Sequence, residues 1–122
     1  MQKLSTEWGY SAPAAASLVG KLNYFAVIDT DGKIAVAGDG VLVVGTITEE
    51  AVAGASATFS TGFILKAVCA EAIDHGAKVA SDTNGKAVNA ASGDYVVGVA
   101  INETTMADQL IEILALHAGR AA

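Results

Sequence analysis

Residues 29–45 read DTDGKIAVAGDGVLVVG, and residues 82–98 nearly repeat them as DTNGKAVNAASGDYVVG. The two copies align without a gap at an offset of 53 residues, and nine of the seventeen aligned positions are identical. The identical pairs are Asp29/Asp82, Thr30/Thr83, Gly32/Gly85, Lys33/Lys86, Ala37/Ala90, Gly40/Gly93, Val43/Val96, Val44/Val97 and Gly45/Gly98. Self-similarity at a fixed offset indicates a duplicated structural unit. The sequence therefore predicts a protein made of two related halves.

Each copy has the composition of short strands joined by tight turns. In the first copy, a turn ends at Gly32, which can adopt positive φ while the nearby Asp side chains bond backbone N–H groups. Residues 33–37 are the expected return strand, and residues 38–40 form the next turn. Residues 41–47 follow as a strand, in which Gly45 indicates a bulge or a closely approaching backbone.

The rest of the chain continues this alternation of β-rich runs and turns. Residues 67–75 have a short helix as an alternative, because Ala and Glu are good helix formers. Residues 109–117 match neither the periodicity of a helix nor that of a strand cleanly. They are interpreted as a closing strand buried on both faces. The nine expected strands are residues 22–28, 33–37, 41–47, 55–60, 63–68, 77–80, 86–89, 95–101 and 109–117. This spacing is typical of an all-β fold, here a compact barrel or sandwich with an internal two-fold repeat.

Residues 1–20 differ in character and are expected to form an extended N-terminal arm, ahead of a single β domain over residues 21–122. The arm has no strand or helix periodicity, and Pro13 interrupts regular structure within it. Trp8 and Tyr10 flank a glycine in this arm. Large aromatic side chains dominate the energetics of protein interfaces, so both are candidate anchors to a partner. The alternative is that Trp8 folds back onto its own domain.

The composition narrows the classes of function. Apolar residues make up 52% of the chain and charged residues 16%, which indicates a folded domain with a core. The net charge of −6 argues against binding to nucleic acid or to an anionic membrane surface, because both need clustered Lys and Arg. No apolar run is long enough for a membrane span, and residues 12–19 are too short and too poor in large apolar residues for a signal peptide.

Few residues offer catalytic or metal-binding chemistry. Cys69 is the only cysteine and lies in an apolar run, so a buried side chain is expected there rather than a nucleophile. The two histidines, His75 and His117, are isolated from other metal-ligand residues. Residues 29–32 resemble the start of a calcium loop, but Lys33 and apolar residues follow instead of further oxygen ligands. The second copy also has Asn84 in place of an Asp. We therefore expect a non-enzymatic protein without a cofactor or a metal.

Three acidic residues, Glu49, Glu50 and Glu103, lie in equivalent loops of the two halves. Paired carboxylates act as acid and base only when their surroundings separate their pKa values. These three stand beside threonines in polar loops, so we expect solvated charge, available for contact with a partner.

A pattern of small residues in the second half resembles the capsid cement or decoration proteins of tailed phages. The residues that carry it are Ala72, Ile73, Gly76, Val79, Asp82, Gly85, Lys86, Val88, Gly93, Val96, Val97, Gly98, Val99 and Ala100, with Val43, Val44, Gly45, Gly62 and Phe63 fitting the same template. The resemblance covers about residues 21–116. It implies a structural protein made in the host cytoplasm that binds the major capsid protein on the outer surface of the virion, as a homotrimer. The candidate capsid contacts are then Trp8, Tyr10, Glu49, Glu50 and Glu103.

Two other classes remain open from the sequence. A barrel-sandwich carrier domain of the biotinyl or lipoyl type is also built from two β halves, and Lys33 or Lys86 would be its modified residue. Neither lysine has the flanking residues expected of such a domain. A small β-barrel enzyme would use Cys69 with His75 as its base.

Overall fold

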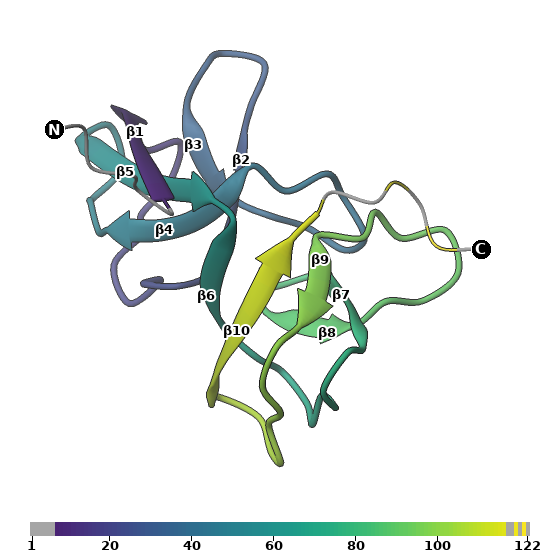
Figure 1. The fold of residues 1–122 in the computed structure, drawn as a ribbon. Helices are drawn as coiled ribbons and strands as arrows, with labels where there is room; N and C mark the ends of the chain where they lie inside the picture. Colours follow the sequence, from purple (N-terminus) through teal and green to yellow (C-terminus); the bar gives the residue numbers. More distant parts are fainter. Residues whose placement is uncertain (1–6, 117–118, 120, 122) are drawn as a thin grey trace, which may run out of the picture.

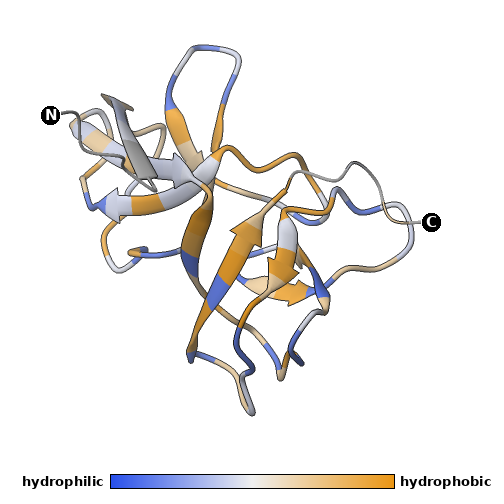
Figure 2. Ribbon diagram, viewed as in Figure 1, coloured by the Kyte–Doolittle hydropathy of each residue, from blue (hydrophilic) through white to orange (hydrophobic). Residues whose placement is uncertain are grey.

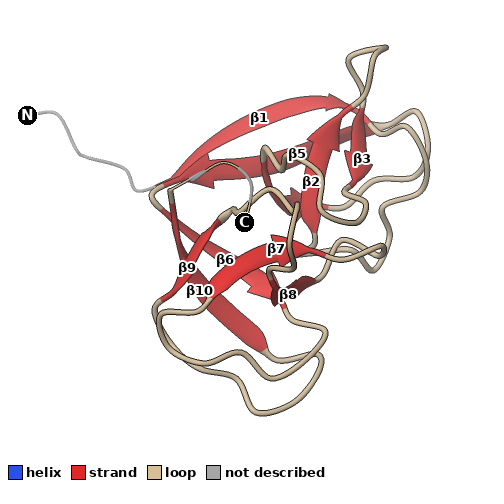
Figure 3. Cartoon of the chain, turned by 90° about the vertical axis from the view of Figure 1, so that its right-hand side faces the viewer, coloured by secondary structure: helices blue, strands red, loops and turns tan. Residues whose placement is uncertain are grey.

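The computed structural model describes residues 7–116, 119 and 121, which form ten β-strands and no helix (Figures 1 and 3). The all-β class predicted from the sequence is confirmed. The strands pair into two antiparallel sheets of five strands each. The first sheet contains the first five strands of the chain and the second sheet contains the other five.

The first sheet has the strand order β1-β5-β4-β2-β3. Its strands are β1 (Glu7–Pro13), β2 (Phe25–Ile28), β3 (Ile34–Val36), β4 (Gly45–Glu49) and β5 (Ser56–Gly62). A parallel bridge between Ala14 and Ile34, just beyond the end of β1, brings the first strand of the sheet back to the last. This bridge closes the sheet on itself.

The second sheet has the order β6-β10-β9-β7-β8, which is the order of the first sheet with five added to each strand number. Its strands are β6 (Ile64–Val68), β7 (Lys78–Ser81), β8 (Ala87–Asn89), β9 (Gly98–Ala100) and β10 (Leu110–Ala115). A parallel bridge between Cys69 and Ala87 closes this sheet as the Ala14–Ile34 bridge closes the first. The same connectivity therefore occurs twice in the chain.

The turns of the two copies are held by matching hydrogen bonds. Asp29 Oδ1 accepts from the backbone N–H groups of Asp31 and Lys33, each at 2.9 Å. Asp82 Oδ1 accepts from the equivalent groups of the second copy, Asn84 at 2.8 Å and Lys86 at 2.9 Å. Because each carboxylate satisfies two N–H groups of its own turn, the Asp residues have a structural role there.

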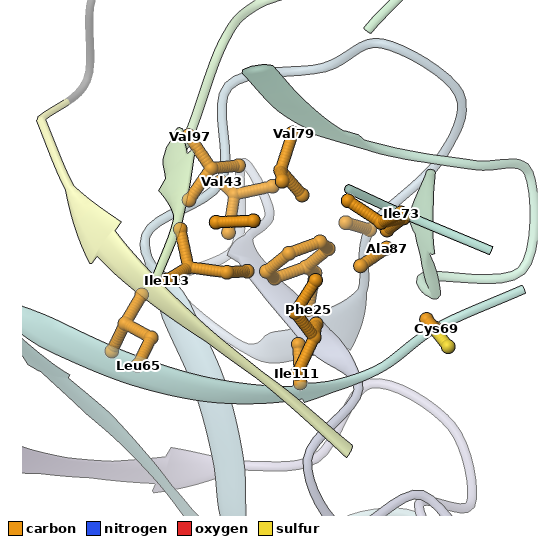
Figure 4. Packing of buried hydrophobic residues seen from close by; sticks show 13 residues of the cluster. Phe25, Val43, Leu65, Cys69, Ile73, Val79, Ala87, Val97, Ile111 and Ile113 are labelled. Carbon is orange, nitrogen blue, oxygen red and sulfur yellow. The ribbon is translucent and has the colours of Figure 1, made fainter. Parts of the chain in front are cut away.

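The buried residues form two clusters, one for each sheet. The cluster of the first half contains Ala12, Ala14, Leu18, Ala26, Ile34, Ile47, Ala51, Ala57 and Phe59. The cluster of the second half contains Leu65, Ala67, Cys69, Ile73, Val79, Ala87, Val97, Ala100, Ile111 and Ile113, and also Phe25, Ala37 and Val43 of the first half (Figure 4). Phe25 is fully buried among the residues of the second half. The two halves therefore share a core.

The structure differs from the sequence-based expectation at the N-terminus. Glu7–Pro13, within the expected arm, is strand β1, paired with β5 at seven positions from Glu7–Gly62 to Pro13–Ser56. Ala14 and Leu18 of the same segment are buried. The expectation that this segment has no regular strand was therefore wrong. Residues 1–6 of the expected arm lie outside the described residues.

Other strand boundaries also differ from the expectation. The strand expected over residues 41–47 begins only at Gly45, and residues 41–44 are irregular. The helix considered for residues 67–75 is not formed, because β6 continues to Val68 and residues 69–75 have no helical turn. The closing strand is β10, but only one of its faces is buried, with Ile111 and Ile113 inside and Leu110 half exposed. Its expected last residue, His117, lies outside the described residues.

Candidate functional site

The aromatic candidates lie on β1, at the edge of the first sheet. The backbone of Trp8 pairs opposite Thr61 of β5, and its side chain lies outside the described part of the structure. The ring of Tyr10 packs against that of Phe59, with centroids 5.5 Å apart and planes tilted by 46°. The side chain of Tyr10 is nevertheless 52% exposed. It is therefore held in place by one neighbour and still available to a partner.

Two of the acidic candidates lie at the end of β4, in the same half as Tyr10. Thr58 Oγ1 donates to Glu49 Oε1 at 2.8 Å, and the hydroxyls of Thr58 and Ser11 are 2.8 Å apart. Glu49, Thr58 and Ser11 thus form a hydrogen-bonded row across β4, β5 and β1. The carboxylate of Glu50 accepts from the backbone N–H of Gly20. Both glutamates are exposed but fixed by these bonds.

The third acidic candidate lies in the other half of the molecule. Glu103 is in the loop between β9 and β10, where its Oε2 atom is 4.0 Å from Nδ1 of His75. Both side chains are more than half exposed. At this exposure an ion pair contributes little to stability, so Glu103 is a solvated surface charge. Tyr10, Glu49 and Glu50 therefore belong to the first half, and Glu103 stands apart from them.

The residues considered for catalysis do not form a site. Cys69 is fully buried, and its Sγ atom donates to the carbonyl oxygen of Met106 at 3.2 Å. His75 is exposed and faces Glu103, so it is not the base beside the thiol. Within residues 7–116 and the two described residues of the tail, no cluster of three His, Cys, Asp or Glu side chains is arranged to hold a metal ion. The part of the chain that the structure describes also has no helix able to span a membrane.

The two lysines considered as modified residues have different surroundings. Lys86 Nζ lies 2.8 Å from Asp108 Oδ1 and 5.8 Å from the centre of the Tyr24 ring. The hydrogen bond to Asp108 raises the pKa of Lys86 above its usual 10.5. Lys86 therefore joins the second turn to the first half. Lys33 lies at the exposed first turn.

The sequence reasoning missed an apolar surface on the second sheet. Figure 2 shows β6, β9 and β10 coloured as mainly hydrophobic, in contrast to the pale strands β1 and β5 of the first sheet. The residues that point away from the core of the second sheet are Ile64, Lys66, Val68, Val99, Leu110, Glu112 and Leu114, which we name the outer face of the second sheet. The alternation of buried Ile111 and Ile113 with the residues between them is the sequence signal for this face.

Comparison with known proteins agrees with the fold. The family model described as phage cement protein matches residues 21–115, more than three quarters of the 122 residues. A search of curated proteins gave no match. Among solved structures, the chain is similar to the crystal structure of the head fiber gp8.5 N base in bacteriophage phi29.

The similarity to that structure has a TM-score of 0.76 at 14% sequence identity, and it covers 95% of this chain and 98% of the other. At this identity it shows a common fold. The family match rests on the sequence itself and includes both copies of the repeat and the strands that follow them. The chain therefore belongs to the phage cement protein family.

Proposed function

We propose that this protein is a capsid decoration protein that binds the outside of an assembled phage head and stabilises contacts between major-capsid subunits. The observation that carries the proposal is the family match over residues 21–115. The structure is compatible with a mechanical role, because the described residues form two closed sheets with a shared core and no catalytic constellation.

The proposed capsid contact lies at the β1 end of the first half. Trp8 and Tyr10 are on the edge strand β1, and Tyr10 presents a half-exposed ring. Glu49 is the last residue of β4, two strands from β1, and Glu50 follows it; hydrogen bonds fix both carboxylates. The ring of Tyr10 and the fixed carboxylates are the two kinds of group, an aromatic anchor and polar groups, that interfaces combine. Glu103 lies in the second half, so it would contribute to capsid binding through a separate contact.

We further propose that the protein acts as a homotrimer on the outer surface of the virion. Each capsid carries many equivalent sites, so weak individual contacts add through multivalency when several copies are linked. The net charge of −6 suits an exterior position, since a net negative charge disfavours binding to the phosphates of packaged nucleic acid.

The test is a thermal-disruption assay on cognate capsids that lack the protein. Purified protein is added in excess and unbound protein is removed, after which the disruption temperature is measured against untreated capsids. The proposal predicts co-sedimentation with the capsids and a higher disruption temperature. Protein that neither sediments with capsids nor raises this temperature would contradict the proposal.

A further inference from the structure

Equivalent rows of residues cross the two sheets and can be compared position by position. In the first sheet, Phe25, Thr46, Ser60 and Gly9 lie opposite one another on β2, β4, β5 and β1. In the second sheet, the row is Lys78, Val99, Leu114 and Ile64 on β7, β9, β10 and β6. Directly opposite residues in antiparallel strands share a face of the sheet. Both rows therefore lie on the same face of the duplicated unit.

Three of the four residues in the row of the first sheet are buried, and Phe25 among them is covered by the second half of the chain, whereas Gly9 on β1 is exposed. The exposed fractions are 0% for Phe25, 2% for Thr46 and 8% for Ser60. Phe25 lies among Ile111 and Ile113, and its backbone N–H donates to Gly85 O of the second copy (Figure 4). This face of the unit is therefore the one that contacts another copy of the same fold within the chain.

The row of the second sheet is more apolar but less buried. Lys78 is exposed, and Val99, Leu114 and Ile64 are only partly buried. Leu110, at the first position of β10, is 50% exposed, and Phe63 and Leu116, next to the ends of β6 and β10, are 62% and 54% exposed. Several exposed large apolar side chains on one part of a surface are typical of an interaction surface.

The charges on this face are opposite and adjacent. Lys66 of β6 and Glu112 of β10 are direct cross-strand partners near the middle of the face, with Val68–Leu110 on one side of them and Ile64–Leu114 on the other. With Lys78 at the end of the row, the face carries two cations and one anion between apolar pairs, so it offers charges of both signs to a second copy. Its excess of one positive charge is too small to select a strongly acidic partner.

We infer that the outer face of the second sheet is where one copy of this protein binds another copy. At Phe25, the equivalent face of the first sheet is already covered by a copy of the same fold, and the open face offers charges of both signs to a second chain. This inference rests on the self-association included in the proposed function and names the surface responsible for it. It is independent of where the protein touches the capsid.

The test compares two leucine-to-lysine variants by solution mass. Leu110, on the outer face, is 50% exposed, and Leu42, in the loop before β4, is 55% exposed, so both changes place a charge at a similarly accessible site. Wild type is expected to have a mass that is a multiple of 12.2 kDa. Leu110→Lys should shift the protein to the 12.2 kDa monomer under the same conditions, whereas Leu42→Lys should retain the wild-type mass.

The outcomes separate this inference from the proposed function. If wild type is an oligomer and both Leu110→Lys and Leu42→Lys keep its mass, the inference alone is overturned. A wild type that is monomeric at every concentration overturns both the inference and the proposed homotrimer. If that monomer still binds capsids, the proposed decoration role is retained. Should Leu110→Lys not fold, Lys66→Glu at an exposed position replaces it. At least tenfold weaker association of Lys66→Glu is expected, and unchanged association overturns the inference.

Discussion

The backbone N–H of Phe25 donates to the carbonyl oxygen of Gly85 at 2.7 Å, and this bond joins the two halves of the duplicated chain. Gly85 has φ of 80°, and a Cβ atom there would meet Cγ1 of Val36. The equivalent Gly32 has φ of 78°, and no atom lies within 4 Å of the position that a Cβ would occupy there. The second turn is therefore packed against β2 and β3, while the first turn projects into solvent.

This difference predicts unequal effects of the same substitution in the two turns. Gly32→Ala and Gly85→Ala should both lose about 1–2 kcal/mol from the left-handed backbone conformation. Gly85→Ala should lose about a further 1–3 kcal/mol, because its methyl group overlaps Val36. The measurement is the free energy of unfolding in urea for both variants. Equal losses would show that the second turn is not packed as described.

Truncation of Phe25 should destabilise both halves together. Phe25→Ala removes a fully buried ring from the shared core, and we expect a loss of about 3–5 kcal/mol with a single unfolding transition. Lys78→Ala is the matched control, since Lys78 occupies the equivalent position but is exposed, and it should change stability by less than about 0.5 kcal/mol. Two separate transitions, observed by circular dichroism and by tyrosine fluorescence, would mean that the halves do not share a core.

The turns were the most predictable part of the fold, because their chemistry is local. Asp29, Gly32 and their counterparts Asp82 and Gly85 determine tight turns through side-chain bonds and positive φ, whatever the rest of the chain does. The short strands β2, β3, β7 and β8 flank these turns and lie within or close to the expected ranges. The expected two related halves correspond to two sheets of the same strand order.

The parts that the sequence did not reveal depend on distant pairing. β1 has the sequence EWGYSAP, which is poor in β-branched residues, and it forms a strand because β5 pairs with it residue by residue. Residues 41–44 show the opposite case, since the favourable run VLVV lies outside any strand. Of the proposed contacts, the placement of Tyr10 against Phe59 required the tertiary structure. The open apolar face of the second sheet could not be predicted, because its exposure depends on how the two halves pack against each other.

The Lys86–Asp108 pair predicts a dependence of stability on alkaline pH. The hydrogen bond to Asp108 raises the pKa of Lys86 above its usual 10.5 in the folded protein. A raised pKa gives a stabilisation that is fully present below pH 10.5 and is lost as the pH rises through the folded-state pKa. The effect is small, because Asp108 is 69% exposed. The difference in unfolding free energy between wild type and Asp108→Asn should stay constant from pH 7 to pH 10 and shrink above pH 10.5. A difference that grows above pH 10.5 would refute this coupling.

Truncation of Tyr10 should weaken capsid binding without unfolding the protein. The ring is 52% exposed, and loss of an aromatic anchor typically costs about tenfold or more in affinity. Leu42→Ala is the control, since Leu42 is 55% exposed but lies in the loop before β4 and is not one of the proposed contact residues. The measurement is a binding isotherm on cognate capsids for wild type and both variants. Equal affinity of Tyr10→Ala and wild type would remove Tyr10 from the contact.

The central claim is that this protein decorates the outside of an assembled phage head. The most direct measurement is a cryo-electron-microscopy difference map between cognate capsids with and without the added protein. We predict additional density on the outer surface, bridging neighbouring major-capsid subunits, into which the two five-stranded sheets fit with β1 toward the shell. A map without added density, or with density only inside the shell, would contradict the claim.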